Sequence, residues 1–326
     1  MAQVGVDEIG TVTRAALEAH GADADVAEAV ARATAVAEAR GNVICGLSYV
    51  ESYCAALASG RVDGRAVPAV ARPAPGVVRV DARQGFAQPA FAAGLPDALA
   101  AARANGIASL SVHGAHTCTS LGYFTAQIAD AGLLGIGFTN ASPVVAPPGG
   151  QEPVIGTNPI AFSVPGAPGI HFDAATSATA LGTVKDAKAA GRPIPAGWAV
   201  DRDGQPTTDP AAALAGALLP MAGAKGWGFG VLSEVMAAGM AGGVASLDVA
   251  GLKSGEGPPH DLGQFYLLID PAPHGGQLSA RVERLSGAVA GQPGARLPGV
   301  AHPVRAEVEV PDALWEAVVA LSRVSA

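Results

Sequence analysis

Charged and aromatic side chains are both scarce in this chain. Only 15% of its 326 residues are charged, 5% are aromatic, and acidic residues outnumber basic ones 28 to 20, for a net charge of −8. A nucleic-acid-binding protein needs a basic face, so this balance argues against a nucleic-acid partner. A small anionic ligand stays compatible with it, because a binding site can be locally positive.

Long apolar runs and paired cysteines are also lacking. The three cysteines, Cys45, Cys54 and Cys118, are an odd number without metal-ligand spacing, which predicts reduced thiols, a cytoplasmic location and no metal. No run of about 18 apolar residues occurs and no basic-led apolar segment opens the chain, so we expect neither a membrane span nor a signal peptide. The length and the 49% of hydrophobic residues suit one large domain or two interleaved ones.

The first part of the sequence is typical of helices, and the part after Val77 alternates between strands and helices. Glycines and first-turn acids mark helices over residues 6–20, 23–40 and 47–59, and a last helix starting at Pro311-Asp312 could return to them. Alternating or buried apolar patterns predict strands over 77–81, 107–112, 134–140, 160–164, 170–173 and 264–270, which indicates α/β layering.

Further elements follow from turn residues and from apolar periodicity. We expect a turn at residues 85–89, then a long helix that ends near Gly106, and another helix over 123–131. Residues 227–241 predict a buried helix because apolar residues cover all its faces. Residues 211–218 and 276–286 predict two shorter helices, the second with an exposed basic face.

The centre of the sequence is dense in turn-forming and small polar residues. Residues 149–162 include Gly149-Gly150 and Gly156-Thr157-Asn158-Pro159, and the block Asp173-Ala174-Ala175-Thr176-Ser177 follows. Glycine lets a backbone approach a ligand closely and Asn tolerates unusual dihedral angles, although two strand-ending turns would look the same. Neither a Gly-x-Gly-x-x-Gly fingerprint nor a Gly-rich Lys-Ser/Thr loop occurs, so a dinucleotide here would not use a Rossmann loop.

Eight blocks of the sequence resemble, in order and spacing, the second, non-Rossmann malate/lactate dehydrogenase family. They are His116, Thr139-Asn140, Gly149-Gly150, Gly156-Thr157-Asn158-Pro159, Asp173-Ala174-Ala175-Thr176-Ser177, Pro206-Thr207-Thr208-Asp209-Pro210, Lys225-Gly226 and Pro298-Gly299. The resemblance covers nearly the whole chain. It implies an α/β fold in which a non-Rossmann NAD(P)-binding domain with a mixed sheet is inserted into a helical domain, in a homodimer.

The same resemblance implies the domain boundaries and the closest branch of the family. The cofactor domain would span residues 76–299, and the helical substrate and dimer domain would combine residues 1–75 with about 300–326. Residues 58–64 and 85–89 look most like the reductases of Δ1-piperideine-2-carboxylate and Δ1-pyrroline-2-carboxylate. By analogy with those members NADPH is the favoured cofactor, with NADH also possible.

The cofactor site implied by the resemblance is spread over the middle of the chain. Lys225 precedes a predicted helix, where a cation is electrostatically unfavourable, so either a phosphate partner or a solvated loop would account for it. The implied cofactor-binding residues are Ser120, Gly122, Asn140, Thr157, Asn158, Asp173, Ala174, Ala175, Thr176, Ser177 and Lys225.

The chain departs from the family pattern where the substrate would lie. Relatives usually carry Ser-His-Gly where this chain has Ile44-Cys45-Gly46, and the histidine is thought to donate a proton through a serine and aspartate relay. The aspartate position aligns with Thr183. Tyr49 replaces an arginine near the substrate and Thr117 replaces an aromatic residue, so both are expected to line the substrate site.

Cys45 and His116 are the remaining candidates for the chemistry. Cys45 would line the pocket, donate a weak hydrogen bond, or simply be a small buried residue. His116 follows a buried strand, where α/β sites collect, and is the better catalytic candidate, as imidazolium for a carboxylate or as acid. We expect Cys45, His116 and Thr183 to converge.

The changed relay favours an imine over a ketone as substrate. A ketone product begins as an alkoxide and needs an acid, whereas solvent can protonate a cyclic imine before hydride arrives. The sequence therefore predicts NAD(P)H-dependent reduction of a cyclic imino acid to L-proline or L-pipecolate. The alternatives are a 2-oxo-acid or 2-hydroxy-acid dehydrogenase that uses His116 as its acid, and a non-catalytic relative that keeps only the cofactor fold.

Overall fold

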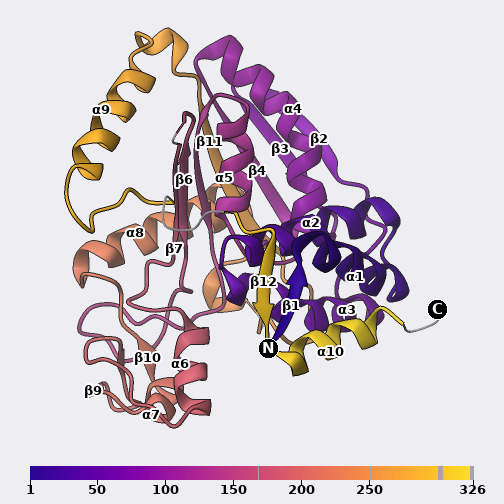
Figure 1. Cartoon of the computed structure of the whole chain (residues 1–326), viewed down its shortest axis with the longest axis vertical. Coiled ribbons are helices and arrows are strands. Elements are labelled where there is room, and N and C mark those ends of the chain that lie inside the picture. Colours follow the sequence, from indigo (N-terminus) through magenta and orange to yellow (C-terminus); the bar gives the residue numbers. More distant parts are fainter. Residues whose placement is uncertain (168, 250, 300–303, 324–326) are drawn as a thin grey trace.

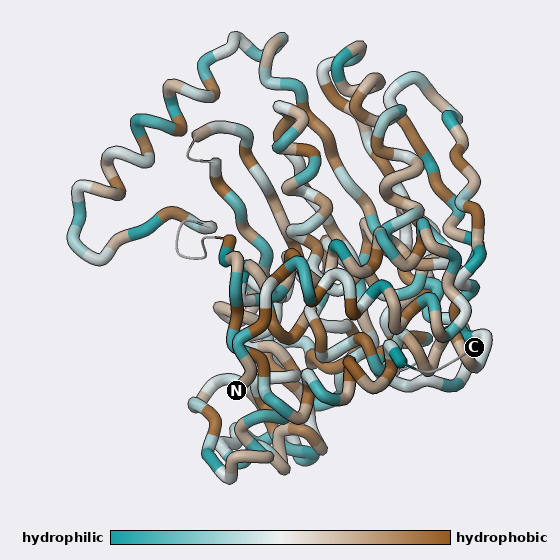
Figure 2. Tube along the Cα trace, turned by 45° about the vertical axis from the view of Figure 1, so that its right-hand side comes forward, coloured by the Kyte–Doolittle hydropathy of each residue, from teal (hydrophilic) through white to brown (hydrophobic). Residues whose placement is uncertain are grey.

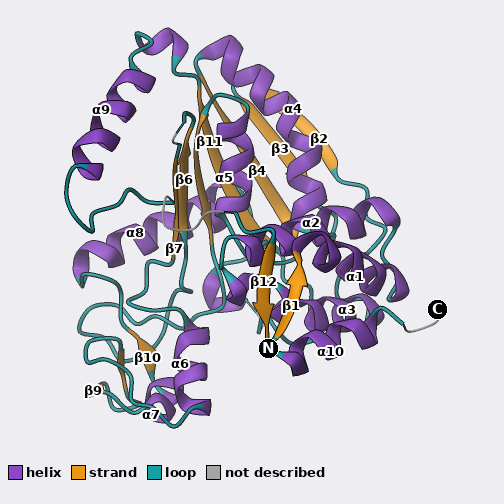
Figure 3. Cartoon of the chain, viewed as in Figure 1, coloured by secondary structure: helices purple, strands orange, loops and turns teal. Residues whose placement is uncertain are grey.

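One seven-stranded sheet forms the centre of the molecule (Figures 1 and 3). The computed structural model describes residues 1–167, 169–249, 251–299 and 304–323. β3 and β4 run parallel, and the other neighbouring strands of this sheet pair antiparallel, so the predicted mixed sheet is confirmed. In spatial order the strands are β2 (Ala69–Ala74), β3 (Val77–Asp81), β4 (Ile107–Ala115), β11 (Leu262–Ile269), β5 (Leu134–Thr139), β6 (Ile160–Val164) and β7 (Ile170–Ala174).

Two helices cover one face of this sheet, α4 (Ala87–Asn105) and α5 (Gly122–Asp130). The rings of Phe91, Phe124 and Tyr266 join both helices to β11, with Phe91 4.9 Å from each of the other two. The helix α4 begins at Ala87, so the predicted turn at 85–89 is wrong in its last three residues. Pro89 fits there because the first turn of a helix needs no N–H from it.

The opposite face is covered by α8 (Ala224–Glu234) and the π-helical segment η3 (Val235–Met240). Ala237 and Ala241 are fully buried under β5 and β11. The outer side is apolar too, and Phe229, Val235 and Met240 are 52%, 52% and 59% exposed. The predicted burial of this helix on all sides is therefore wrong for the single chain, because the sheet covers only one of its apolar faces.

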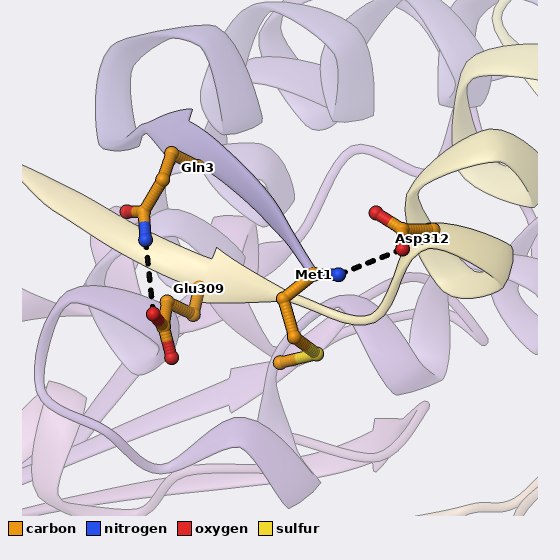
Figure 4. A network of polar contacts seen from close by, with 4 residues as sticks. All are labelled: Met1, Gln3, Glu309 and Asp312. Carbon is orange, nitrogen blue, oxygen red and sulfur yellow. Dashed lines mark hydrogen bonds and ion pairs between the residues drawn. The ribbon is translucent and has the colours of Figure 1, made fainter.

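Helices from both ends of the chain form a second layer below the sheet (Figure 1). They are α1 (Val6–Ala19), α2 (Ala24–Ala39), α3 (Val50–Ala58) and α10 (Asp312–Leu321), and the predicted return of the last helix is confirmed. A two-stranded sheet of β1 (Ala2–Gly5) and β12 (Glu307–Val310) ties the ends together. Its polar contacts include Met1 N to Asp312 Oδ2 at 2.7 Å and Gln3 Nε2 to Glu309 Oε1 at 3.0 Å (Figure 4).

A third group of short elements surrounds a small core that includes Val145, Ile194 and Leu218. The helix predicted over 211–218 is wrong in its last residues, because the helix ends at Ala215 and residues 217–218 form a strand. The strands were not predicted, because two-residue strands carry no periodic signal. The elements are α6 (Leu181–Ala189), α7 (Pro210–Ala215), β8 (Ala199–Val200), β9 (Pro206–Thr207) and β10 (Ala217–Leu218).

The remaining helix, α9 (Leu278–Ala290), packs through Val282 and exposes Arg281 and Arg284, as its predicted basic face requires. Short helical turns occur at η4 (Ser246–Asp248) and η5 (Ala272–His274). Hydrophobic and hydrophilic residues are interspersed along the helices (Figure 2). In the part of the chain that the structure describes, no helix has the length and apolarity to cross a membrane.

Candidate active site

A cavity of about 590 Å³ lies between the end of α2, the start of α5, the edge strand β7 and residues 296–299. Successive side chains of a strand alternate between its faces, so His171 and Asp173 project to the same side of β7. Both line the cavity. The Pro298 carbonyl accepts a hydrogen bond from His171 N at 3.3 Å, which holds the 296–299 segment against the sheet edge.

Asp173 closes one side of the cavity at the start of α5. Its Oδ2 accepts hydrogen bonds from Gly122 N at 2.8 Å and from Ser120 Oγ at 3.2 Å. A Cβ at Gly122 would lie 2.9 Å from Asp173 Cβ, so this approach requires glycine. Protein atoms surround the Asp173 carboxylate on the cavity wall, and this desolvation raises its pKa. The hydrogen bonds lower the pKa by less, and solvent still reaches the side chain through the cavity.

Two arginines give the other side of the cavity a positive charge. Arg40 and Arg296 both line it, and Arg40 Nε is buried without a hydrogen-bond partner among the described residues. His171 Nδ1 lies 3.0 Å from Ser163 Oγ. Burial, and then the nearby Arg40, lower the pKa of His171, so the imidazole is neutral near pH 7. A phosphate group suits the two guanidinium groups.

The cavity fits a nicotinamide dinucleotide in size and in polar character. Its volume falls within the about 300–1,000 Å³ of small-molecule sites. Gly122 allows a close backbone approach, and Arg40 Nε is a donor that has no partner among the described residues. Of the residues predicted to bind the cofactor, Ser120, Gly122 and Asp173 line this cavity.

The other predicted cofactor residues lie outside the cavity lining, and most are engaged in protein contacts. Asn158, fully buried, donates from Nδ2 to Gly230 O at 3.2 Å and to Glu234 Oε2 at 2.8 Å. Thr176 Oγ1 donates to the carbonyls of Thr157 and Asn158, both at 3.1 Å. These hydrogen bonds tie the chain after β7 to α8.

Five more of these residues lie outside the cavity lining, and two of them make side-chain hydrogen bonds to the protein backbone. Asn140 Nδ2 donates to Val244 O at 2.7 Å, while its buried Oδ1 has no partner among the described residues. Ser177 Oγ donates to Thr179 O at 2.7 Å. Ala174 and Ala175 are half-buried directly after Asp173, and Lys225 is exposed at the start of α8.

Cys45 lies beside the cavity on two short helical turns, η1 (Val43–Cys45) and η2 (Leu47–Tyr49). Between them, a Cβ at Gly46 would collide with the Glu38 carboxylate, whose Oε1 accepts a hydrogen bond from Leu47 N at 2.7 Å. Burial, and then the charge of Asp173, raise the pKa of Cys45 to about 12. The thiol therefore stays protonated and is a poor acid near neutral pH.

Thr183 and Tyr49 lie around the same turns. Thr183 is exposed in the first turn of α6. A Cβ at the preceding Gly182 would lie 3.4 Å from Ile44 Cγ2, so the start of α6 packs against the Cys45 segment. Tyr49 is half-buried, and desolvation followed by Cys45 raises the pKa of its hydroxyl. The structure thus brings Thr183, Tyr49 and the Cys45 segment together.

His116 lies deeper, in an aromatic row. Its centroid is 5.8 Å from that of Tyr53, 5.4 Å from Phe86 and 4.0 Å from His260, on which it stacks with an interplanar angle of 9°. Neither ring nitrogen has a hydrogen-bond partner among the described residues. Burial, then His260 and Arg61, keep the pKa of His116 well below its ordinary value, so the ring is neutral.

His260 belongs to this region and was not predicted. Its Nδ1 accepts a hydrogen bond from the backbone N of Thr117 at 3.3 Å, and Thr117 itself is buried. Burial, and then Arg61, lower the pKa of His260 to about 4. In sequence His260 has only the signal of a lone histidine after two prolines, and its pairing with His116 spans 144 positions.

A mixed sheet with a polar cavity at its edge, lined by two arginines and an aspartate, is suited to bind a small anionic molecule. The chain belongs to the malate/L-lactate dehydrogenase family, whose sequence profile matches residues 4–315. This confirms the resemblance and the fold class inferred from the sequence.

Individual relatives are similar over most of their length. The chain is 41% identical over 302 residues to a Δ1-pyrroline-2-carboxylate reductase of Ancylobacter novellus, covering 91% of this chain and 89% of that one. It is 38% identical to a (2R)-3-sulfolactate dehydrogenase (NADP+) of Chromohalobacter salexigens, covering 95% of each. The crystal structure of Δ1-piperideine-2-carboxylate reductase from Pseudomonas syringae superposes with a TM-score of 0.89 at 37% identity, covering 98% of this chain and all of that one.

Proposed function

We propose that the protein reduces a cyclic imino acid, Δ1-pyrroline-2-carboxylate or Δ1-piperideine-2-carboxylate, to L-proline or L-pipecolate with a nicotinamide cofactor. The observation that carries this proposal is the thiol at the proton-donor position. The pKa of Cys45 is raised to about 12. A general acid works best with a pKa near the operating pH, so ketone reduction is poorly served at this site.

An imine removes the need for that acid. The cofactor, when bound, supplies a hydride to the C=N carbon, and solvent can protonate the imine nitrogen beforehand. Cys45, Tyr49 and Thr183 then need only enclose and orient the ring. His116 lies behind Tyr53 with a lowered pKa, which supports a neutral role in packing rather than proton transfer. The sequence similarity to imino-acid reductases supports the same substrate class.

The proposed cofactor is NADPH, with NADH as the weaker partner. Ser120, Gly122 and Asp173 would contact it along the cavity. Arg40 and Arg296 support NADPH because they offer two guanidinium groups for an additional phosphate. Asn140, Thr157, Asn158, Thr176 and Ser177 would shape the wall beyond β7 without direct contact, and the role of Lys225 rests on the family resemblance.

The proposed assembly is a homodimer working in the cytoplasm in proline metabolism. The outer face of α8 and η3, with Phe229, Val235 and Met240 exposed, supports an interface with a second copy. The three free thiols support a reducing compartment. We further propose that residues 76–299 act as the cofactor domain and that residues 1–75 with about 300–326 form the substrate and dimer domain.

The experiment follows NADPH oxidation by the purified protein with two imino acids and two oxo acids. Fast turnover of Δ1-pyrroline-2-carboxylate or Δ1-piperideine-2-carboxylate, with pyruvate and oxaloacetate much slower, is the expected result. Faster turnover of an oxo acid would establish the 2-oxo-acid dehydrogenase instead. Stoichiometric cofactor binding without turnover of any of them would establish a non-catalytic relative.

A relay-restoring variant sharpens the same experiment. Ile44→Ser, Cys45→His and Thr183→Asp together would introduce the proton-donor relay that relatives carry. Because only the ketone reaction needs the acid, the variant should gain oxo-acid turnover and change imine turnover little. A gain in imine turnover of the same size would contradict the proposal.

A further inference from the structure

The segment 251–258 is fixed to the end of α3 by a buried arginine. Arg61 is only 3% exposed. Its Nε donates to Pro258 O at 2.8 Å, and its Nη1 donates to Gly251 O at 3.1 Å and to Ser254 O. Burying a guanidinium group is costly unless its N–H groups are hydrogen-bonded, and here Nε and Nη1 are bonded while the buried Nη2 has no partner among the described residues. These contacts therefore hold the segment in one place.

Two further contacts hold the same segment. Ser59 Oγ donates to Gly255 O at 2.6 Å. A Cβ at Gly255 would lie 2.6 Å from Ala55 Cβ, so the segment approaches α3 as closely as only glycine allows. A surface loop tied down at four of its backbone positions has a preorganised conformation.

This segment presents Lys253 beside the Cys45 turns. Lys253 Nζ donates to Ser48 O at 3.1 Å and to Ser48 Oγ at 3.2 Å, and it lies 4.4 Å from the centroid of the Tyr49 ring. An ammonium has three N–H donors, so one is left for a ligand. Within the described ranges, no carboxylate lies within ion-pair distance of Lys253.

Three elements meet at this point. The charge of Lys253 lowers the pKa of Cys45, against the larger effect of burial. Burial lowers the pKa of Lys253 and the charge of Lys185 on α6 lowers it further, whereas the carboxylate of Asp186 on the same helix raises it. Thr183 lies in the first turn of the same helix. The lysine thus faces the place enclosed by the Cys45 turns and α6. Residues 43–49 themselves, Val-Ile-Cys-Gly-Leu-Ser-Tyr, contain no cation.

We propose that the ammonium of Lys253 binds the carboxylate of the substrate and that Arg61 is the positioning residue that holds it there. The assignment rests on the proposed function, since it takes the substrate to be a carboxylate. A carboxylate needs a hydrogen-bonded cation when a ligand displaces its water. Among the described residues, Lys253 keeps one N–H free and has no carboxylate within ion-pair distance. Its segment is fixed, and it lies beside the residues expected to enclose the ring.

The test compares Lys253→Met with Lys253→Arg and with Lys188→Met, which removes an exposed cation three residues beyond Lys185 on α6. Loss of one charge-assisted hydrogen bond should raise the KM for Δ1-pyrroline-2-carboxylate about 10- to 100-fold in Lys253→Met. The KM for NADPH should stay within about twofold of the wild-type value, because the lysine contacts substrate alone. Lys253→Arg should recover most of the loss, and Lys188→Met should match the wild type. An unchanged KM in Lys253→Met would overturn the assignment.

Calorimetric binding of pyrrole-2-carboxylate, measured against pyrrole, separates this inference from the proposed reaction. If the wild-type protein turns over no imino acid but binds pyrrole-2-carboxylate and loses that binding in Lys253→Met, the proposed function fails and the lysine assignment stands. If imino-acid turnover is fast and Lys253→Met binds pyrrole-2-carboxylate as tightly as the wild type, the function stands and the assignment fails.

The positioning role of Arg61 has its own readout. Arg61→Met should raise the KM for the imino acid and speed hydrogen exchange of backbone amides in 251–258. Lys253→Met should raise the KM without speeding that exchange. If hydrogen exchange in 251–258 is equal in all three proteins and the KM of Arg61→Met is unchanged, Arg61 does not position Lys253.

Discussion

The region around Asn158 and the region around Cys45 are both dense in small polar residues, but they use them differently. Around Asn158, the side chains of Asn158, Thr176 and Glu234 form hydrogen bonds with other parts of the protein. Around the cavity and Cys45, Arg40 Nε lacks a partner among the described residues, and Lys253 retains a donor. Polar groups without a hydrogen-bond partner in the protein distinguish a binding site from a structural network. The density of polar residues in the sequence does not.

The largest expected effect comes from breaking the structural network. Asn158→Ala would remove a fully buried amide that donates to Gly230 O and to the half-buried Glu234 carboxylate. We expect the free energy of unfolding to fall by about 2–4 kcal/mol. Urea denaturation measures it, with NADPH affinity of the folded protein as the second reading. Unchanged stability combined with a large loss of NADPH affinity would make Asn158 a ligand residue.

The next effect is acid destabilisation by the buried histidine pair. Because the pKa of folded His260 is lowered to about 4, the unfolded chain binds the proton first as pH falls below about 6.5. Stability present above pH 6.5 is therefore lost progressively toward pH 4, by about 2–3 kcal/mol from this group. His116, whose pKa is also lowered, acts in the same direction. Urea denaturation at several pH values measures the free energy of unfolding. In His260→Phe this free energy should fall less between pH 6.5 and pH 4 than in the wild type. An equal fall in both proteins would show that His260 is not the cause.

A smaller effect is expected on cofactor choice. Arg40→Gln and Arg296→Gln each remove a guanidinium from the cavity. If these groups bind a phosphate that NADH lacks, the Kd for NADPH should rise about tenfold while that for NADH changes about twofold or less. Fluorescence titration with both cofactors gives the two Kd values. Arg281→Gln, on the exposed face of α9, is the matched control. An equal rise in the Kd for NADPH and for NADH would show that the arginines contact a part that both cofactors share.

The smallest effect is expected at Cys45. A thiol with a pKa of about 12 contributes little as an acid, so Cys45→Ala should keep kcat for the imino acid within about twofold. Steady-state kinetics between pH 6 and 9 test this. A loss of more than about tenfold in kcat with an unchanged KM would show that the thiol acts in the transition state.

Much of the fold could be predicted because long elements carry periodic signals. The helices at residues 6–19 and 24–39 and the buried strand at 134–139 follow directly from apolar spacing and terminal glycines. The exposure of the outer face of α8 could not be predicted, because an apolar pattern on all sides does not show which face the chain itself covers. The strands of two residues in the third group leave no pattern at all.

The candidate site divides in the same way. The family resemblance pointed to Ser120, Gly122 and Asp173, which line the cavity, and to Cys45, Tyr49 and Thr183, which lie around one another. His260 and Lys253 were missed, since each approaches the site from more than 140 positions away in the sequence. Contacts of that kind depend on tertiary packing, and a single sequence does not record them.

The most direct measurement of the central claim is the ratio of kcat/KM for Δ1-pyrroline-2-carboxylate to that for pyruvate, both with NADPH on one preparation of the wild-type protein. A site that carries a thiol with a pKa of about 12 at the position of the relatives' proton donor predicts a ratio on the order of 100 or more. A ratio below one would contradict the claim and identify a 2-oxo-acid dehydrogenase.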